Sequence, residues 1–178
     1  MIDTPRLRLR AWREADKADF AAVVNTPAMM RHFGGVKPRT DIDPLIDQQI
    51  ASQTADGCSM WAVTLHDGTL AGICGVRWQR LYRGLPVFGE LEIGWRVGER
   101  WWGQGIAREA AAASIDWAWA NSDAPRVAAW TSAGNTRSWG LMKRLGMHRL
   151  PALDFRHPKV AAGDPDGAMI VYAIDRPA

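Results

Sequence analysis

The stretch that decides the fold reads ELEIGWRVGERWWGQGIAREA over residues 90–110. Its first part reads as a strand and its Ala-rich end as a helix, with Arg100-x-x-Gly103-x-Gly105 at the junction. Glycines there let the backbone approach a ligand closely, while free N–H groups and the helix dipole attract an anion. The junction therefore predicts a binding site for a pyrophosphate.

Three kinds of anion-binding loop compete for this junction. A Walker-type loop requires Gly-Lys-Ser/Thr, and no such run follows Gly105. A dinucleotide fingerprint needs a third glycine where this chain has Arg108, and the junction also lies in mid-chain after a meander of strands. The remaining candidate is the pyrophosphate loop of enzymes that use coenzyme A.

The patterns on either side of the junction predict a single mixed α/β domain over residues 1–178. In order they indicate a strand, two helices, an antiparallel meander of three strands, then a helix, a strand, a helix and two strands. Strands are expected at residues 6–10, 60–65, 70–79, 87–97, 125–131, 147–155 and 168–174, and helices at 16–24, 43–54, 106–120 and 136–145.

Short local signals accompany these elements. Thr26-Pro27 resembles a helix N-cap followed by a first-turn proline, and Asp43-Pro44 is expected to start the second helix. The Asp67-Gly68 pair between two apolar runs predicts a hairpin. Gly146 is expected to end the last helix.

Three segments of the chain, in order, resemble the GNAT superfamily of N-acetyltransferases. The junction matches the superfamily signature Gln/Arg-x-x-Gly-x-Gly/Ala between a strand and a helix. Around it, Glu92-Ile93-Gly94-Trp95 and Trp102-Gly103-x-Gly105-x-Ala107-x-Glu109-Ala110 resemble the centre of the branch that acetylates ribosomal-protein N-termini (RimJ/RimL type). Thr4-x-Arg6-Leu7-x-Leu9-Arg10 resembles the opening of that branch. Asn135-x-x-Ser138 with Lys143-x-Leu145-Gly146-Met147 resembles its second coenzyme A motif.

The resemblance implies a GNAT-like fold with a V-shaped split between the fourth and fifth strands, where the pantetheine of acetyl-CoA lies like an added strand. Backbone groups near Trp95 would pair with the pantetheine, and Arg100 with the following amides would hold the pyrophosphate. Asn135 would contact the pantetheine arm. The residues expected to bind acetyl-CoA are Trp95, Arg96, Val97, Arg100, Trp102, Gly103, Gln104, Gly105, Ile106, Ala107, Asn135, Ser138 and Lys143.

Acetyl transfer to an amine requires a group that removes a proton from the amine. Glu92 is the first candidate for this base and Glu90 the second. In a regular strand both side chains share a face with Gly94, opposite Leu91 and Ile93. The same pattern is compatible with two charges on a solvent face, and a bulge would re-aim one of them.

Ser138 is the candidate acid that protonates the leaving thiol. Many relatives in the wider superfamily use a tyrosine four residues later, where this chain has Met142, so it departs from their pattern and matches the Asn-x-x-Ser branch. A first-turn helix serine with no catalytic role is the alternative. Asn135 is also the expected N-cap of the last helix, a role compatible with a cofactor contact.

Composition limits the kinds of partner. Apolar residues make up 47% and charged residues 23%, and no apolar run approaches the roughly 20 residues that span a bilayer. The formal charge of +3 suits a phosphate-bearing ligand, but it is equally compatible with a solvated surface that binds nothing. The chain has no cluster of basic residues interleaved with aromatic ones, so nucleic-acid binding is not expected. Cys58 and Cys74 are expected to be reduced and buried, with no metal site, in a cytoplasmic protein.

Several features remain open at this level. The acceptor is a primary amine, either a protein N-terminus or a small molecule, and an acyl group longer than acetyl is compatible with the motifs. A coenzyme A-binding sensor or interaction module without turnover is the alternative function. A homodimer is possible. The roles of His148, His157 and Asp154 are unassigned, and structural roles are favoured for the two histidines.

Overall fold

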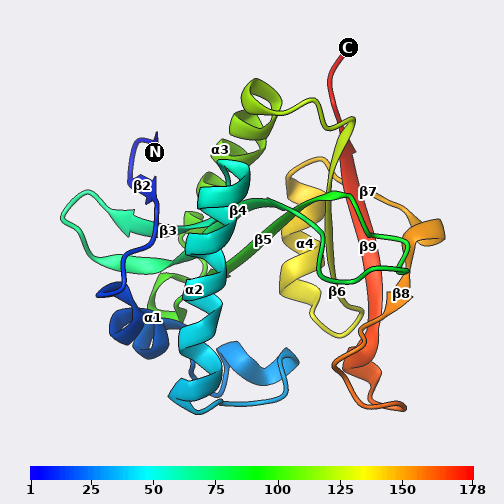
Figure 1. Ribbon diagram of the computed structural model, residues 1–178, viewed down its shortest axis with the longest axis horizontal. Helices are drawn as coiled ribbons and strands as arrows, with labels where there is room; N and C mark the ends of the chain where they lie inside the picture. Colours follow the sequence, from blue (N-terminus) through cyan, green and yellow to red (C-terminus); the bar gives the residue numbers. More distant parts are fainter.

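A nine-stranded mixed sheet forms the centre of the protein in a computed structural model that describes residues 1–178 (Figure 1). The strand order is β1-β2-β3-β4-β5-β6-β9-β7, with β8 also paired to β9. Neighbouring strands are antiparallel except β5 and β6, which run parallel.

The strands are β1 (Ile2–Asp3), β2 (Leu7–Arg10), β3 (Met60–Leu65), β4 (Leu70–Trp78), β5 (Leu91–Val97), β6 (Arg126–Ser132), β7 (His148–Arg149), β8 (Phe155–Arg156) and β9 (Ala168–Asp175). The helices are α1 (Asp16–Val24), α2 (Arg39–Asp56), α3 (Ile106–Asn121) and α4 (Thr136–Arg144). Four short 3-10 turns complete the chain, namely η1 (Met29–His32), η2 (Glu99–Trp101), η3 (Pro151–Leu153) and η4 (Pro165–Gly167).

Helices cover both faces of the sheet, with α2 in front of it and α3 behind it in Figure 1. On the front face, Phe20 of α1 and Ile46 of α2 are buried in one cluster with Ile73 of β4. On the opposite face, the alanines of α3 and Met142 of α4 join a larger cluster with Ile93 of β5. Because alanine has a small side chain, α3 packs closely against the strands.

The predicted strand over 87–97 is wrong at its start, because β5 begins only at Leu91. Gly89 has a φ of 87° and turns the chain out of the extended conformation. Val87 is fully buried, but in a separate small cluster away from the meander. The apolar character that suggested a longer strand therefore reflects burial without strand pairing.

The predicted strand over 147–155 is also wrong, because β7 and β8 have two residues each and η3 separates them. Pro151 has no N–H for a strand ladder and begins the 3-10 turn instead. A side chain replaces part of the missing pairing, since Val171 N donates to Asp154 Oδ1 at 2.9 Å.

The second helix starts earlier than predicted, at Arg39, so Asp43-Pro44 lies inside α2. Proline here removes a single helix hydrogen bond, close to the helix start. Thr26-Pro27 precedes only the 3-10 turn η1, where Met29 N donates to Thr26 Oγ1 at 3.3 Å. β1 and the 3-10 turns were not predicted, and the remaining strands and helices match the expected bounds to within one residue.

Candidate functional site

Strands β5 and β6 separate after a short paired end. Each strand has seven residues, but only Leu91↔Val127 and Glu92↔Ala128 are paired. From there the two strands diverge, as Figure 1 shows. This divergence is the V-shaped split that the resemblance implies between the fourth and fifth predicted strands.

The edge of β5 that faces the split offers backbone groups to a ligand. Peptide groups of a strand point alternately to its two edges. Gly98 N donates to Ala71 O at 2.8 Å, so the even-numbered residues of β5 direct their peptide groups toward β4. Odd-numbered residues, including Trp95 and Val97, therefore direct theirs into the split.

Of the three residues expected to pair through the backbone with pantetheine, Trp95 is the best placed. Val97 O already accepts a hydrogen bond from Trp102 Nε1 at 2.6 Å. Arg96 turns its carbonyl toward β4, where it lies close to Gly72. Trp95 keeps its N–H and C=O free, whereas Arg96 contributes its side chain to this region.

The loop between β5 and α3 contains a row of free donors. Gly103 and Gly105 have φ values of 76° and 80°, in the left-handed region. The N–H groups from Gly103 to Arg108 donate no hydrogen bond within the chain, and the first that does is Glu109, to Gly105 O at 3.0 Å. Free donors at the positive end of a 16-residue helix fit the pyrophosphate of coenzyme A.

Side chains from the N-terminal segment hold this anion loop in place. Glu109 accepts hydrogen bonds from Thr4 Oγ1 at 2.6 Å, Arg6 N at 3.0 Å and Arg6 Nε at 2.6 Å. Arg6 Nη1 also donates to Gln104 O at 2.9 Å. Burial works against the charge of Glu109, but the hydrogen bonds from Thr4 and Arg6 outweigh it and lower its pKa. The segment around Thr4 and Arg6 and the segment around Glu109 both resemble the family, and together they hold the loop in place.

The start of α4, the second predicted coenzyme A segment, lies beside the anion loop. Arg137 places its guanidinium carbon 4.3 Å from the centroid of the Trp102 ring. Asn135 caps the helix, with Oδ1 accepting from Ser138 N at 3.3 Å, while its amide nitrogen has no partner. The half-buried Ser138 makes no hydrogen bond through its hydroxyl. Both side chains therefore have groups free for a ligand.

Arg100 and Lys143, the other expected cofactor contacts, are exposed cations that stack on aromatic rings. The Arg100 guanidinium carbon lies 4.4 Å from the Trp101 ring centroid, and Lys143 Nζ lies 4.7 Å from that of Trp139. Stacking orients both charges and leaves their N–H groups free for phosphate.

Glu92 is buried, with 8% of its surface exposed, and one of its oxygens is free. Oε2 accepts from Arg77 Nε at 2.9 Å and from Gln79 Nε2 at 3.2 Å, while Oε1 makes no hydrogen bond and is not sealed from solvent. The β4–β5 register is continuous, so no bulge re-aims this side chain. Burial raises the pKa of Glu92, and Arg77 offsets this only in part. A carboxylate of this kind can accept a proton.

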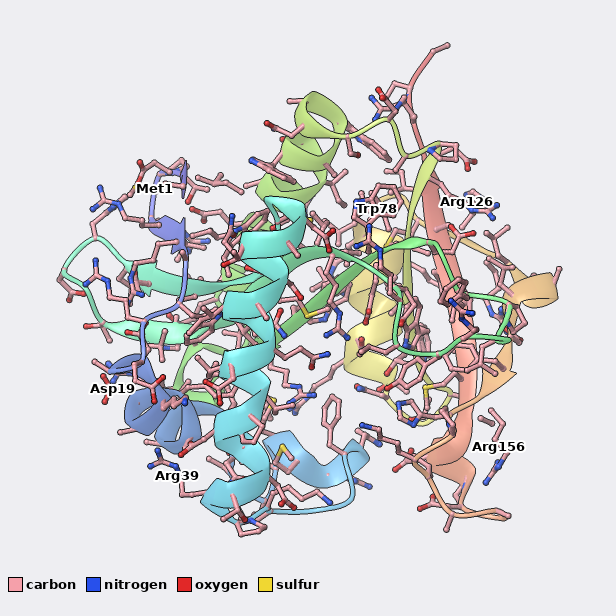
Figure 2. All side chains as sticks on the ribbon, viewed as in Figure 1. Met1, Asp19, Arg39, Trp78, Arg126 and Arg156 are labelled. Atoms are coloured by element: carbon pink, nitrogen blue, oxygen red, sulfur yellow. The ribbon has the colours of Figure 1, made fainter.

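Glu90 is engaged in an ion pair just before β5. Its two oxygens accept from Arg126 at 2.6 Å and 2.9 Å in a bidentate arrangement. Figure 2 labels Arg126 at the end where β5 and β6 meet. Glu90 therefore joins the two strands at the paired end of the split, and Glu92 has the better geometry for a base.

The three unassigned residues of the tail all have partners. Asp154 forms a bidentate ion pair with Arg149, at 2.6 Å and 2.5 Å. His148 lies on the short outer strand β7, and its Nε2 is 3.7 Å from a carboxylate oxygen of Asp175. His157 Nε2 lies 3.1 Å from the hydroxyl of Tyr82. All three residues therefore have partners within the chain, in agreement with the structural roles favoured for the two histidines.

Sequence reasoning missed two groups of residues near the split. Arg77 holds Glu92, and a lone charge in the otherwise apolar strand β4 was the available signal. In the second group, Ser132 Oγ donates to Asp166 Oδ1 at 2.6 Å and His32 Nδ1 lies 3.1 Å from the same oxygen. This group joins η1, the end of β6 and η4, and no local pattern indicates contacts between segments so far apart.

Other sequence expectations concern thiols, membranes and metals. Cys58 and Cys74 are free and buried, as predicted, and burial raises their pKa values to about 11 and about 12. Such thiols are poorly reactive. No helix is both long enough and apolar enough to cross a membrane. No three His, Cys, Asp or Glu side chains gather as a metal site would require.

Comparison with known proteins agrees with this geometry. Residues 6–148 match the family model of the acetyltransferase (GNAT) domain. The uncharacterized protein YkkB of Bacillus subtilis is 29% identical over 147 residues, which cover 82% of this chain and 83% of YkkB. An acetyltransferase structure from Agrobacterium tumefaciens has a TM-score of 0.77 and 25% identity, covering 97% of this chain and 92% of its own.

A structure of RimL, a ribosomal-protein N-acetyltransferase, in complex with coenzyme A has a TM-score of 0.76 and 17% identity. It covers 97% of this chain and 95% of its own, and at that identity it supports the fold alone. The GNAT-like α/β fold expected from the sequence resemblance is confirmed.

Proposed function

This chain belongs to the GNAT acetyltransferase family, and from that premise we propose that it transfers an acetyl group from acetyl-CoA to a primary amine by direct attack in a ternary complex. The amine belongs to a protein N-terminus or to a small molecule. The observation that carries the proposal is the row of free N–H groups from Gly103 to Arg108, beside the open edge of β5 and the buried Glu92.

The chain's own groups are suited to hold acetyl-CoA, which supplies a thioester carbonyl as the acetyl donor. Arg100 and the free amides of the anion loop, from Gly103 through Ile106 and Ala107, would bind the pyrophosphate. The C=O of Trp95 would accept a hydrogen bond from the pantetheine, as a strand accepts one from its neighbour, which leaves the Trp95 N–H for the thioester carbonyl. The free amide nitrogen of Asn135 and the charge of Lys143 would add contacts from α4.

Glu92 and Ser138 are the groups proposed to move protons. A lysine amine has a pKa of about 10.4 and an α-amine about 8, so the acceptor arrives largely protonated. Glu92 Oε1 would take a proton from it, directly or through a water. The amine nitrogen then bonds to the carbonyl carbon as the carbon–sulfur bond breaks. Ser138 Oγ would pass its proton to the departing sulfur and take up the second proton of the amine, so that the hydroxyl is restored and the product is a neutral amide. The Trp95 N–H would stabilise negative charge on the carbonyl oxygen.

The proposal is tested by calorimetric titration with acetyl-CoA, followed by thiol-release assays on a panel of amines. We expect binding that weakens by about 10-fold or more in Arg100→Ala, as loss of a charge-assisted hydrogen bond predicts. Arg80→Ala, an exposed arginine at the opposite end of β4 and β5 from the loop, is the matched control. Absence of binding would overturn the proposal. Binding without thiol release from any amine would instead support a coenzyme A-binding module without turnover.

A further inference from the structure

Arg96 carries a positive charge that no group of the chain neutralises. The guanidinium makes no ion pair and donates no hydrogen bond, and it stacks on the Phe33 ring, whose centroid lies 4.0 Å from the guanidinium carbon. The side chain is half-buried. A guanidinium has five N–H donors, and removing them from water without partners is unfavourable.

The other half-buried arginines all have partners. Carboxylates bind Arg10, Arg77, Arg126 and Arg149, and three carbonyl oxygens bind Arg176. Arg96 is the exception in a chain that otherwise satisfies its partly buried cations. Because unpaired buried charges are costly, such an exception indicates a group reserved for a ligand.

The surroundings of Arg96 leave room for one more negative charge. Arg77 is a second cation on the same face, and its ion pair uses Glu92, the nearest carboxylate. Burial and the neighbouring Arg77 lower the pKa of Arg96 to about 10, and Glu92 opposes this only in part. Arg96 therefore stays charged at neutral pH. Arg77, Arg96 and Glu92 together therefore carry a net charge of one positive unit.

The position of Arg96 links this charge to the acceptor. Glu92 and Arg96 lie on the same face of β5, the face covered by α1 and α2, whereas the anion loop leads into α3 on the opposite face. Arg96 is close enough to Glu92 to lower its pKa. Phe33, 41% exposed, covers one side of the guanidinium and leaves its in-plane N–H groups for a planar anion such as a carboxylate.

We propose that Arg96 binds an anionic group of the amine acceptor, so that the preferred acceptors are primary amines with a carboxylate a few bonds from the nitrogen. This inference rests on the proposed acetyl transfer and deepens it by assigning the acceptor's charge. A free amino acid and an acidic residue at a peptide N-terminus both present this chemistry.

The test compares pairs of similar acceptors that differ in this charge. The pairs are an amino acid against its amide, and a short peptide with N-terminal glutamate against one with glutamine. We expect kcat/KM of the wild-type protein to favour the carboxylate member by roughly 10- to 100-fold, as for a hydrogen-bonded charge pair. Arg96→Gln should abolish the preference mainly through KM, Arg96→Lys should restore part of it, and Arg8→Gln should leave it unchanged. The pair with the larger preference identifies the source of the carboxylate.

A binding readout separates this inference from the proposed function. Each acceptor pair is titrated calorimetrically into the protein–coenzyme A complex, in wild type and Arg96→Gln, with coenzyme A affinity measured as a folding control. Tighter binding of the carboxylate member in wild type alone supports the inference even without turnover. Equal affinities for the two members, or a preference that persists in Arg96→Gln, overturns it. Acetyl transfer without charge preference would leave the proposed function intact and remove only the role of Arg96.

Discussion

The two sides of the split present different chemical groups to their ligands. The side proposed to bind the coenzyme, formed by residues 98–108 and the first turn of α4, offers mainly backbone N–H groups, of which those from Gly103 to Arg108 have no partner in the chain. The side proposed to bind the acceptor, formed by Glu92, Arg77, Arg96 and Phe33, offers charged side chains held in a partly buried network. Backbone donors depend on local turn conformation, whereas the charges of the network depend on contacts between strands. Changes on the two sides should therefore have separable effects.

The largest expected effect is on the acceptor side, in Glu92→Gln. Removing a general base typically costs about 10²- to 10⁴-fold in rate. We expect kcat to fall by that factor while acetyl-CoA affinity stays unchanged, since Glu92 lies on the face away from the anion loop. Thiol-release kinetics and calorimetry measure the two quantities. A parallel loss of coenzyme affinity would mean that the two sides are not separable, and near-wild-type turnover would remove Glu92 as the base.

The next effect should fall on the coenzyme side, in Gly105→Ala. A left-handed conformation at a residue with Cβ costs about 1–2 kcal/mol, and relief of that strain would displace the free donors. We expect acetyl-CoA affinity to weaken by about 10-fold with kcat at saturation largely retained. Gly57→Ala is the matched control, because Gly57 has a φ of 69° but lies at the end of α2, and a Cβ there would meet no other atom. Equal coenzyme affinities in the two variants would contradict the assignment of the loop.

A smaller effect is expected for Ser138→Ala. This variant tests whether a residue at the start of α4, on the coenzyme side, takes part in catalysis. A thiol has a pKa of about 8.5 and leaves readily, so loss of the proposed acid should lower kcat only several-fold. Because Asn135 caps α4 through the backbone N–H of Ser138, the helix start should persist. Thr136→Ala, an exposed neighbour, is the control for helix effects. Unchanged turnover and coenzyme affinity would leave Ser138 without a role.

The smallest effect should appear in the pH dependence of the rate. Burial raises the pKa of Glu92, and the base acts when deprotonated, so activity should fall as pH decreases through this raised pKa. The acid limb of kcat/KM should lie above the value of about 4.3 for a free glutamate side chain. Arg77→Gln removes the main opposing charge and should move the limb to higher pH. If the midpoint of the acid limb does not change in Arg77→Gln, the limb reports the titration of a group other than Glu92.

Sequence patterns predicted the helix and strand that follow the split better than the end of the split where β5 and β6 pair. Residues 106–121 and 126–132 were located because an Ala-rich helix and an apolar strand carry their own periodicity. The start of β5 was misplaced because buried Val87 looks like a strand residue, although Gly89 has already turned the chain. The ion pair between Glu90 and Arg126 was not predicted either. Its partners are 36 residues apart, and no pattern in one segment indicates a contact with the other.

The sequence by itself was enough to predict the family, through three ordered segments that resemble it. It also predicted the fold class and a loop with free donors, because glycines, a helix start and an Ala-rich helix are local features with local physical meaning. Tertiary structure alone decided how the acidic and basic side chains are used. It paired Glu90 with Arg126, left Glu92 with a free oxygen and gave Arg96 no partner. The charge of a side chain is written in the sequence, but its burial and its partners arise only when distant strands come together.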